Sequence, residues 1–593
     1  MTCDARLKRW VNQPPASPIV EALRAAERRR ALDLLGTNDR VLDLASEAGV
    51  TGGIDASVTR VDFSPAASEY AEQVLDDVDA FHLADPESPA LPLDAGAFDA
   101  AVSIGPYDWK FLAVEALTAE VDRVLAPDGR FVFSVPTPRS PYAVAGWPRN
   151  RYYTPDEALS HVSPEWRLAD HELVFQYPYY AHMAVSTLPD RYQEPFVDLG
   201  ERASDLLTAR ERWDDASYLV LAVEPHRYQA RLDGALDCLF RPIDANGFWD
   251  ESDGKLLRAL DYEITGRGAG GPSFSWTPDD RELWRYAPFA LMGTMQWRAS
   301  ALGHDEYDAK IERALSYFTR KVDGETLHEM PSYGVGPLTC AFALAADVLD
   351  DDHEHVARRL FEHARERFDF SHAEDSLLAY GWSYLHERDP DPEVGDALSD
   401  ALWRMNERLT PEGLFAFDNH TTRRHQNQMY ACWGFARAAE VTGQAGYLDG
   451  VERVLDRTIE RRMRDDGAFV WEDVSLPRRV RRAMTKRLGF RPPHWDFLYE
   501  CHQTFFVNAV AHYYRAGGEV DYDRAVRRAM SWIDGDSGRG DLVELSGIGV
   551  PMRFLTVDDR LDVDDQTYKG SYEIGSYVMA LSNLLAGPFR ARR

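Results

Sequence analysis

The pattern of the sequence changes after Glu224 and Pro225. Up to this point short apolar runs alternate with helical stretches, whereas beyond it the signal is of helices alone. A chain of 593 residues also exceeds the roughly 250–300 residues at which a single core stops growing. We therefore expect a multidomain protein, with an α/β domain over residues 1–225 and an all-α domain over residues 226–593.

Several apolar runs in the first domain have the length and spacing of strands separated by helices. Four of them favour a parallel sheet, and the last two favour an antiparallel pair that completes it. The runs are RVLDLA (40–45), VTRVDF (58–63), FDAAVS (98–103), RFVFSV (130–135), Trp166 to Phe175 and Ala216 to Val223. Residues 138–215, rich in Tyr and Pro, are expected to cap a site on this sheet or to dock the second domain.

The stretch LPLDAGAFDAAVS (91–103), followed by EVDRVLAPDGRFVFSVP (120–136), resembles class I S-adenosylmethionine-dependent methyltransferases. The resemblance implies a Rossmann-like fold and S-adenosylmethionine as a cofactor. By the same resemblance, Asp43 ends the strand that opens into the binding loop. Gly49, Asp62 and Asp85 would contact the cofactor, with Asp62 holding the ribose hydroxyls.

The loop after Asp43 departs from the three-glycine pattern of that family. It reads Ala45, Ser46, Glu47, Ala48 and Gly49. A carboxylate therefore stands at the middle glycine position, where the backbone would pass closely against the ligand. The following GVTGGIDASVT is too short and too rich in Gly for the usual first helix. The domain is thus either a working methyltransferase or a degenerate one, kept as a scaffold or for another ligand.

The second domain contains a repeat in which a Gly lies four residues before a Tyr. The pairs are Gly303/Tyr307, Gly443/Tyr447 and Gly518/Tyr522. Each pair follows a helix rich in small and aromatic residues and precedes an amphipathic helix with a 3.6-residue apolar stripe. A turn with Gly and a short extended segment comes next, as in DGETLHEM (323–330) and DGAFVWED (466–473).

Six inner helices are predicted, each with an outer partner before it. They lie near residues 281–301, 333–349, 373–388, 423–442, 498–517 and 568–586. Helical hairpins that cannot bury their apolar faces alone close into a ring. The pattern resembles the (α/α)6 toroids of glycoside hydrolases, polysaccharide lyases and sugar epimerases. The likeness is architectural, and no catalytic motif of a single family carries over.

The loops that enter the inner helices are expected to gather at one mouth, where polar and aromatic residues concentrate. Sugars need flat aromatic faces for their C–H surfaces, and carboxylates or amides for their hydroxyls. The expected substrate-binding residues are Trp249, Trp276, His328, Tyr333, Gln428, Trp471, Trp495 and Tyr568. The expected catalytic residues are Asp418, His420, His425, Glu500 and His502.

Two chemistries suit such a mouth. A pair of carboxylates can hydrolyse a glycosidic bond by acid and base catalysis. Alternatively, a Tyr or His base can abstract the proton beside a uronate carboxyl while Arg423 or Arg424 neutralises that carboxyl. For each residue the structural alternative is a helix cap or a buried hydrogen-bonded side chain.

The five cysteines are few and widely spaced, which argues against a disulfide framework and favours a reducing compartment. Cys340, Cys432 and Cys501, which adjoins His502, fall on separate inner helices. Toroid enzymes that use zinc have Cys and His ligands in such a place. Without a close CxxC or HxxxH spacing, the sequence favours buried free thiols over a zinc site.

The chain has 98 acidic and 66 basic side chains, a net charge of −32. Such a surface repels nucleic acid and is typical of a halophilic protein, the alternative being an ordinary acidic enzyme. The N-terminus lacks the apolar core of a signal peptide, and no apolar run reaches the roughly eighteen residues of a membrane span, so we expect a cytoplasmic location. The basic segment 477–493 is predicted to contact anionic lipid or the phosphate of a lipid- or nucleotide-linked sugar, or else to neutralise an acidic neighbour.

These features together predict a carbohydrate-active protein of surface-glycan or polysaccharide metabolism, with the toroid as the site of chemistry. One alternative is an O-methyltransferase whose toroid binds the glycan acceptor. The other is a non-enzymatic scaffold of a glycan assembly complex.

Overall fold

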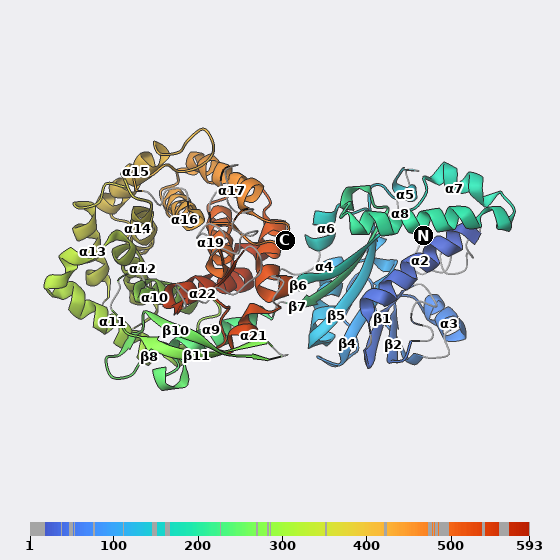
Figure 1. Cartoon of the computed structure of the whole chain (residues 1–593), viewed down its shortest axis with the longest axis horizontal. Coiled ribbons are helices and arrows are strands. Elements are labelled where there is room, and N and C mark those ends of the chain that lie inside the picture. The colour runs from blue at the N-terminus through green and yellow to red at the C-terminus, as the bar shows by residue number, and fades with distance from the viewer. Residues whose placement is uncertain are drawn as a thin grey trace. The chain divides into compact units, whose positions relative to one another are not determined.

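The computed structural model divides the chain into two compact units, Met1–Arg227 and Tyr228–Arg593 (Figure 1). The structure describes residues 18–591 except 37, 47–50, 52–53, 75–77, 111, 145–150, 161–165, 226, 269–270, 282–283, 285, 350–352, 420–423, 472–476, 478–479, 481–483, 485–496, 537–539 and 557–567. The predicted site residues Gly49, His420 and Trp495 lie outside the described residues, as do Arg423 and most of segment 477–493.

The first unit is built on a seven-stranded sheet with the order β3-β2-β1-β4-β5-β7-β6. Its strands are β1 (Arg40–Leu44), β2 (Ser57–Asp62), β3 (Val78–Leu83), β4 (Phe98–Ile104), β5 (Leu125–Pro136), β6 (Trp166–Val174) and β7 (Tyr218–Pro225). Strands β1 to β5 are parallel, and β7 is antiparallel to both β5 and β6, which confirms the predicted sheet with its antiparallel pair. Strand β3 was missed, because it is an edge strand without fully buried residues.

The sheet carries apolar side chains on both of its faces. On one face α2 (Pro18–Leu35) buries Ala31, Leu34 and Leu35 against the strands. On the other, α4 (Val114–Val124) buries Leu117 and Val121. Helix α2 was not predicted from the sequence. The remaining helices are α3 (Pro65–Val74), α5 (Pro141–Val144), α6 (Pro155–Ser160), α7 (Tyr179–Ser186) and α8 (Glu194–Ala209).

In the second unit, the described residues form six inner helices that pack side by side in a closed ring (Figure 1). The inner helices are α10 (Tyr286–Arg298), α12 (Ser332–Val348), α14 (Ser376–Arg388), α16 (His425–Val441), α19 (Glu500–Arg515) and α22 (Ser571–Ala586). The outer helices are α9 (Tyr228–Phe240), α11 (Asp308–Asp323), α13 (Glu354–Arg365), α15 (Pro392–Asn406), α17 (Leu448–Arg462) and α20 (Asp523–Ser531). Each inner helix packs against the next, and α22 returns to α10. The predicted (α/α)6 toroid is confirmed.

Glycines let the inner helices approach closely. A Cβ at Gly336 in α12 would lie 2.2 Å from the carbonyl oxygen of Leu377 in α14. A Cβ at Gly434 in α16 would lie 2.1 Å from the carbonyl oxygen of Ser376 in α14. Real Cβ atoms do not come so near, so these positions require residues without a side chain. The small residues noted in the sequence therefore set the width of the ring.

Aromatic rings fill the middle of the toroid. The ring of Phe289 in α10 lies 5.8 Å from the rings of Tyr430 and Trp433 in α16, on another side of the circle. It also lies 6.2 Å from Phe505 in α19 and 6.4 Å from Tyr572 in α22. Helices that are not neighbours in the ring thus share one hydrophobic core.

The second unit also contains short strands, of which β8 lies in the segment NGFWD (246–250) that the sequence predicts to be extended. A hairpin of β10 (Ala259–Gly268) and β11 (Gly271–Asp279) is extended by β14 (Tyr568–Gly570), which leads into α22. Smaller pairs are β8 (Trp249–Asp250) with β9 (Lys255–Leu256), and β12 (Phe497–Tyr499) with β13 (Phe554–Thr556). The short helices α21 (Leu542–Ser546) and α23 (Pro588–Ala591) complete the unit.

The prediction of an extended segment at residues 323–330 is wrong. Residues Glu325–Glu329 form a 3-10 helix, because this segment carries polar residues where the equivalent loops bury aromatic ones. Of the helices in the described part of the chain, none combines the length and the apolar character needed to cross a membrane.

Candidate functional site

Three inner helices begin beside one another and bring the predicted residues of their first turns together. Helix α16 begins at His425 and α19 at Glu500, while β14 leads into the start of α22. The imidazole Nε2 of His425 lies 3.0 Å from the carbonyl oxygen of His502. The backbone amide of Gly570 donates to Glu573 at 3.1 Å. The candidate site is this end of the ring.

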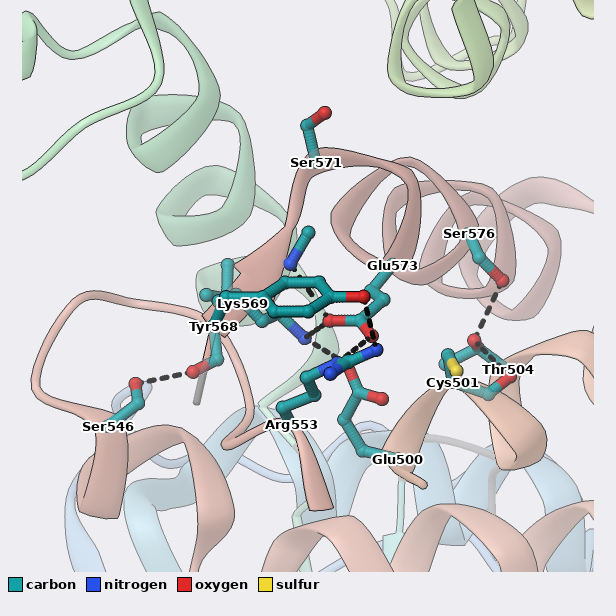
Figure 2. Close-up of polar contacts among 12 residues, drawn as sticks. Glu500, Cys501, Thr504, Ser546, Arg553, Tyr568, Lys569, Ser571, Glu573 and Ser576 are labelled. Carbon is teal, nitrogen blue, oxygen red and sulfur yellow. Dashed lines mark hydrogen bonds and ion pairs between the residues drawn. The ribbon is translucent and has the colours of Figure 1, made fainter. Parts of the chain in front are cut away.

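A buried cluster of four ionisable groups lies where α19 and α22 begin (Figure 2). The ammonium of Lys569 pairs with Glu500 and lies 3.6 Å from a carboxylate oxygen of Glu573. The Nε of Arg553 donates to Glu573 at 2.6 Å. None of the four residues is more than 3% exposed. Burial of so many charges is costly unless each has a partner, and here the two cations alternate with the two acids.

Glu500 is the acid of this cluster that keeps one carboxylate oxygen without a hydrogen bond to the described residues. Burial raises the pKa of its carboxyl to about 8, against the opposing attraction of Lys569. One carboxylate oxygen meets Lys569, while the other has no hydrogen-bond partner among the described residues. A carboxyl that holds its proton near neutral pH can act as a general acid.

Tyr568 covers the cluster and is only partly buried. Its hydroxyl accepts from Nη2 of Arg553 at 3.0 Å and lies 3.0 Å from the hydroxyl of Tyr286. The guanidinium carbons of Arg553 and Arg258 lie 3.8 and 4.8 Å from the centre of its ring. Burial also raises the pKa of Tyr568, so its hydroxyl keeps its proton. Tyr568 is therefore a partly exposed aromatic ring fixed by its contacts with two guanidinium groups.

Two histidines adjoin the same end of the ring. The rings of His425 and His502 lie 4.9 Å apart, and both side chains are buried. Burial lowers the pKa of His502 to about 3 and that of His425 well below its usual value, so both imidazoles are neutral. The ring of Trp471 lies 5.5 Å from His502, and the guanidinium of Arg424 lies 4.9 Å from the Trp471 ring. Trp471 is partly exposed.

Ligand atoms of Glu500, Cys501 and Glu573 lie within 4.8 Å of one another, the spacing of a metal site. Two features of the cluster oppose metal binding there. The ammonium of Lys569 already stands between the two carboxylates. Burial also raises the pKa of the Cys501 thiol well above its usual value, whereas a metal needs the thiolate. Lys569 supplies the positive charge that a metal ion would bring.

Of the predicted catalytic and substrate-binding residues, Asp418, Gln428 and His328 make contacts outside this cluster. The carboxylate of Asp418 is largely exposed and accepts from Arg408 at 2.9 Å. The side-chain amide of Gln428 is buried and bonds both the amide and the carbonyl of Phe415. His328 is exposed on the 3-10 helix after α11.

The predicted aromatic residues also differ in their surroundings. Trp249 is fully buried, and its indole donates to Glu251 at 2.6 Å. Trp276 is partly buried on β11, 5.2 Å from the ring of Tyr262. Tyr333 is partly buried in the first turn of α12. Of the aromatic residues predicted to bind substrate, Trp471 and Tyr568 lie beside the group around Glu500.

Lys569 and Arg553 were not singled out from the sequence. The sequence feature that could have identified them is a cation among apolar and aromatic neighbours, in YKGSYE and PMRFLT. A charged residue in such a setting is buried only if an acid meets it, and the acids come from other segments.

In the first unit, the two acids expected at the cofactor are joined by Arg60. Its Nη1 donates to Asp43 at 2.8 Å, and its Nε and Nη2 donate to Asp62 at 2.8 and 3.2 Å. The three side chains are 3% exposed or less. Burial opposes the charge on Arg60, but its attraction to the two acids raises its pKa. Both oxygens of Asp62 are therefore engaged by Arg60 rather than turned to a ligand.

The third expected contact, Asp85, is exposed after β3. Its carboxylate accepts from the backbone amide of Glu87 at 2.9 Å, which is a local turn. Of the two acids expected at the ribose and adenine, Asp62 is engaged by Arg60 and Asp85 caps a local turn through one of its oxygens.

Residues 36–133 match the family model described as a methyltransferase domain. No curated protein shows a significant match to the chain. Geranyl diphosphate C-methyltransferase from Streptomyces coelicolor A3(2) is 17% identical over 36% of this chain and 83% of its own, with a TM-score of 0.25.

Other solved structures match the part of the chain that holds the toroid. A sugar epimerase from a ruminal bacterium is 14% identical over 59% of this chain and 98% of its own, with a TM-score of 0.42. Unsaturated glucuronyl hydrolase from Bacillus sp. GL1 is 14% identical over 61% of this chain and 98% of its own, with a TM-score of 0.43. With the topology of both units and the family match, the chain joins a methyltransferase-like α/β domain to an (α/α)6 toroid.

Proposed function

We propose that the toroid, residues 226–593, binds a carbohydrate and acts on it by acid and base chemistry, with Glu500 as the proton donor. The observation that carries this proposal is the state of the Glu500 carboxyl. It is buried, its pKa is raised to about 8, and one oxygen is free of hydrogen bonds to the described residues. A protonated carboxyl of this kind is what a leaving oxygen needs.

The neighbours of Glu500 supply the other requirements of a sugar site. Trp471 and Tyr568 are partly exposed aromatic rings on which the C–H face of a sugar can stack. Arg424, 4.9 Å from the Trp471 ring, adds a cation beside one of these faces. This pairing supports a sugar with a carboxylate, such as a uronate, as the ligand.

The neutral histidines are candidates for the base in the same reaction. His425 and His502 hold their rings 4.9 Å apart at the start of α16 and α19. An imidazole whose pKa is held low is unprotonated at neutral pH but is a weak base, and the negative charge of a bound uronate beside it would raise its pKa and make it a better proton acceptor. Lys569 and Glu573 are positioning residues in this proposal, because Lys569 pairs with the Glu500 carboxyl and itself lies 3.6 Å from Glu573.

The experiment is a screen of neutral and uronate-containing oligosaccharides at high salt, with both binding and turnover measured. Glu500→Gln should keep the affinity for the responsive glycan and lose at least about a hundredfold in kcat. Trp471→Ala should weaken binding by about tenfold or more. Glu460→Gln and Trp403→Ala, at exposed outer-helix positions, are the matched controls. Turnover that survives Glu500→Gln unchanged would contradict the proposal.

A second candidate is an S-adenosylmethionine-dependent O-methyltransferase whose toroid binds the glycan acceptor. The match of residues 36–133 to a methyltransferase domain favours it. The engagement of Asp43 and Asp62 by Arg60 weighs against it. Glycan binding to the toroid without turnover, together with methyl transfer to that glycan, would select this candidate over the first.

A further inference from the structure

Arg60 satisfies its charge and most of its donors inside the first unit. Its Nη1 bonds Asp43, its Nε and Nη2 bond Asp62, and Nη2 also donates to the carbonyl oxygen of Ser46 at 2.6 Å. The register of the parallel strands explains the first contact, because Asp43 in β1 stands directly opposite Arg60 in β2. Asp62 follows two residues later on the same face of β2.

Both carboxylate oxygens of Asp43 also accept hydrogen bonds from within the protein. One of its oxygens accepts from the backbone amide of Ser46 at 3.1 Å, and the other from the hydroxyl of Thr51 at 2.9 Å as well as from Arg60. Asp43 near the end of β1 and Asp62 at the end of β2 are therefore part of one set of hydrogen bonds.

The same set of hydrogen bonds fixes the start of the loop after β1. The hydroxyl of Ser46 accepts from the amide of Ile104 at 3.0 Å and lies 3.3 Å from the carbonyl of Val102, both in β4. The amide of Ala45 donates to the carbonyl of Val61 at 2.7 Å. Arg60 binds the Ser46 carbonyl from the other side. The start of this loop is thus bonded to both neighbouring strands of the sheet.

We propose that Arg60 has replaced the adenosyl ligand as the partner of Asp43 and Asp62, so that the first domain does not bind S-adenosylmethionine. Asp62 is 2% exposed and Arg60 holds both of its oxygens, so a ribose would have to displace Arg60 to reach that carboxylate. The buried guanidinium of Arg60 would then be paired with Asp43 alone. A buried charge that loses one of its partners is strongly unfavourable. The domain keeps the methyltransferase-like sheet, and an internal ion-paired triad closes the edge where a nucleotide would lie.

The test is isothermal titration of the full chain with S-adenosylmethionine and S-adenosylhomocysteine. The wild-type protein should give no heat of binding up to about 1 mM ligand. A micromolar Kd in the wild type that is lost in Asp62→Asn would overturn the proposal, because Asp62 would then be a ligand contact. This result is independent of glycan binding to the toroid, so either proposal can fail alone.

Hydrogen exchange gives a second readout, and its ligand arm uses the wild-type protein alone. Neither ligand should change the exchange of residues 41–46 and 58–62 in the wild type. Arg60→Met should speed exchange in both segments, whereas Arg40→Met, at the largely exposed Arg40–Asp99 pair, should not. Protection of these segments by S-adenosylhomocysteine in the wild type would also overturn the proposal.

Discussion

The ammonium of Lys569 pairs with the carboxyl of Glu500 and also lies 3.6 Å from Glu573, so one cation joins the starts of two neighbouring inner helices. Lys569 belongs to β14, directly before α22, and Glu500 is the first residue of α19. Arg553 binds the second acid from a third segment of the chain. The buried cluster therefore fixes the position of the Glu500 carboxyl relative to the ring.

Replacement of Lys569 by Met should destabilise the toroid by about 3 kcal/mol, because removal of one partner leaves buried acids without their cation. Urea unfolding of the full chain, followed by tryptophan fluorescence, measures this loss. Lys255→Met is the control, since Lys255 pairs with a largely exposed Asp253 and should cost less than about 1 kcal/mol. In a double-mutant cycle, Glu500→Gln should cost less in the Lys569→Met background than alone. Additive costs would contradict the coupling.

The raised pKa of Glu500 predicts a pH dependence of stability. Burial favours the protonated carboxyl in the folded state, where the pKa is about 8, compared with 4.5 in an unfolded chain. The stability gained from this proton is fully present below pH 4.5 and is lost as the pH rises towards 8. The wild type should therefore lose stability relative to Glu500→Gln, by up to about 1.4 kcal/mol per pH unit, within this window. Denaturation of both proteins between pH 5 and 9 measures the difference, and a flat difference would mean that Lys569 keeps Glu500 ionised.

The ring of helices was predictable because its local signals agree with its tertiary packing. The helix expected at residues 333–349 is Ser332–Val348, and the one expected at 423–442 is His425–Val441. Small residues at fixed positions, aromatic residues and the Gly-to-Tyr turn all recur, and each has a local cause. Tyr307, Tyr447 and Tyr522 each stand at the N-cap of an outer helix.

The cluster around Glu500 was predicted only in part. Glu500 and Tyr568 precede or begin predicted inner helices, so their place at one end of the ring followed from the helix pattern. Arg553 reaches Glu573 only through the fold. The ion pairs of a buried cluster depend on distances between segments that no periodicity encodes.

Arg60 shows the same limit in the first domain. The resemblance to methyltransferases drew attention to Asp43 and Asp62 as ligand contacts. Their partner lies between them in the sequence, at Arg60 in VTRVDF, but its significance depends on the register of β1 against β2. A one-residue shift would have turned its side chain to the other face of the sheet.

The width of the ring gives the last prediction. Gly336 faces the backbone of α14, where an added Cβ would lie 2.2 Å from the carbonyl oxygen of Leu377. Gly336→Ala should therefore push α12 and α14 apart and lower the free energy of unfolding by about 1–3 kcal/mol, although Ala is the better helix former. Gly446→Ala is a matched control, because no atom lies within 4 Å of its added Cβ. Thermal unfolding of both variants compares them. If the ring adapts without cost, Gly336→Ala will match Gly446→Ala, and the spacing of the inner helices would then be set by the aromatic core around Phe289 rather than by the glycines.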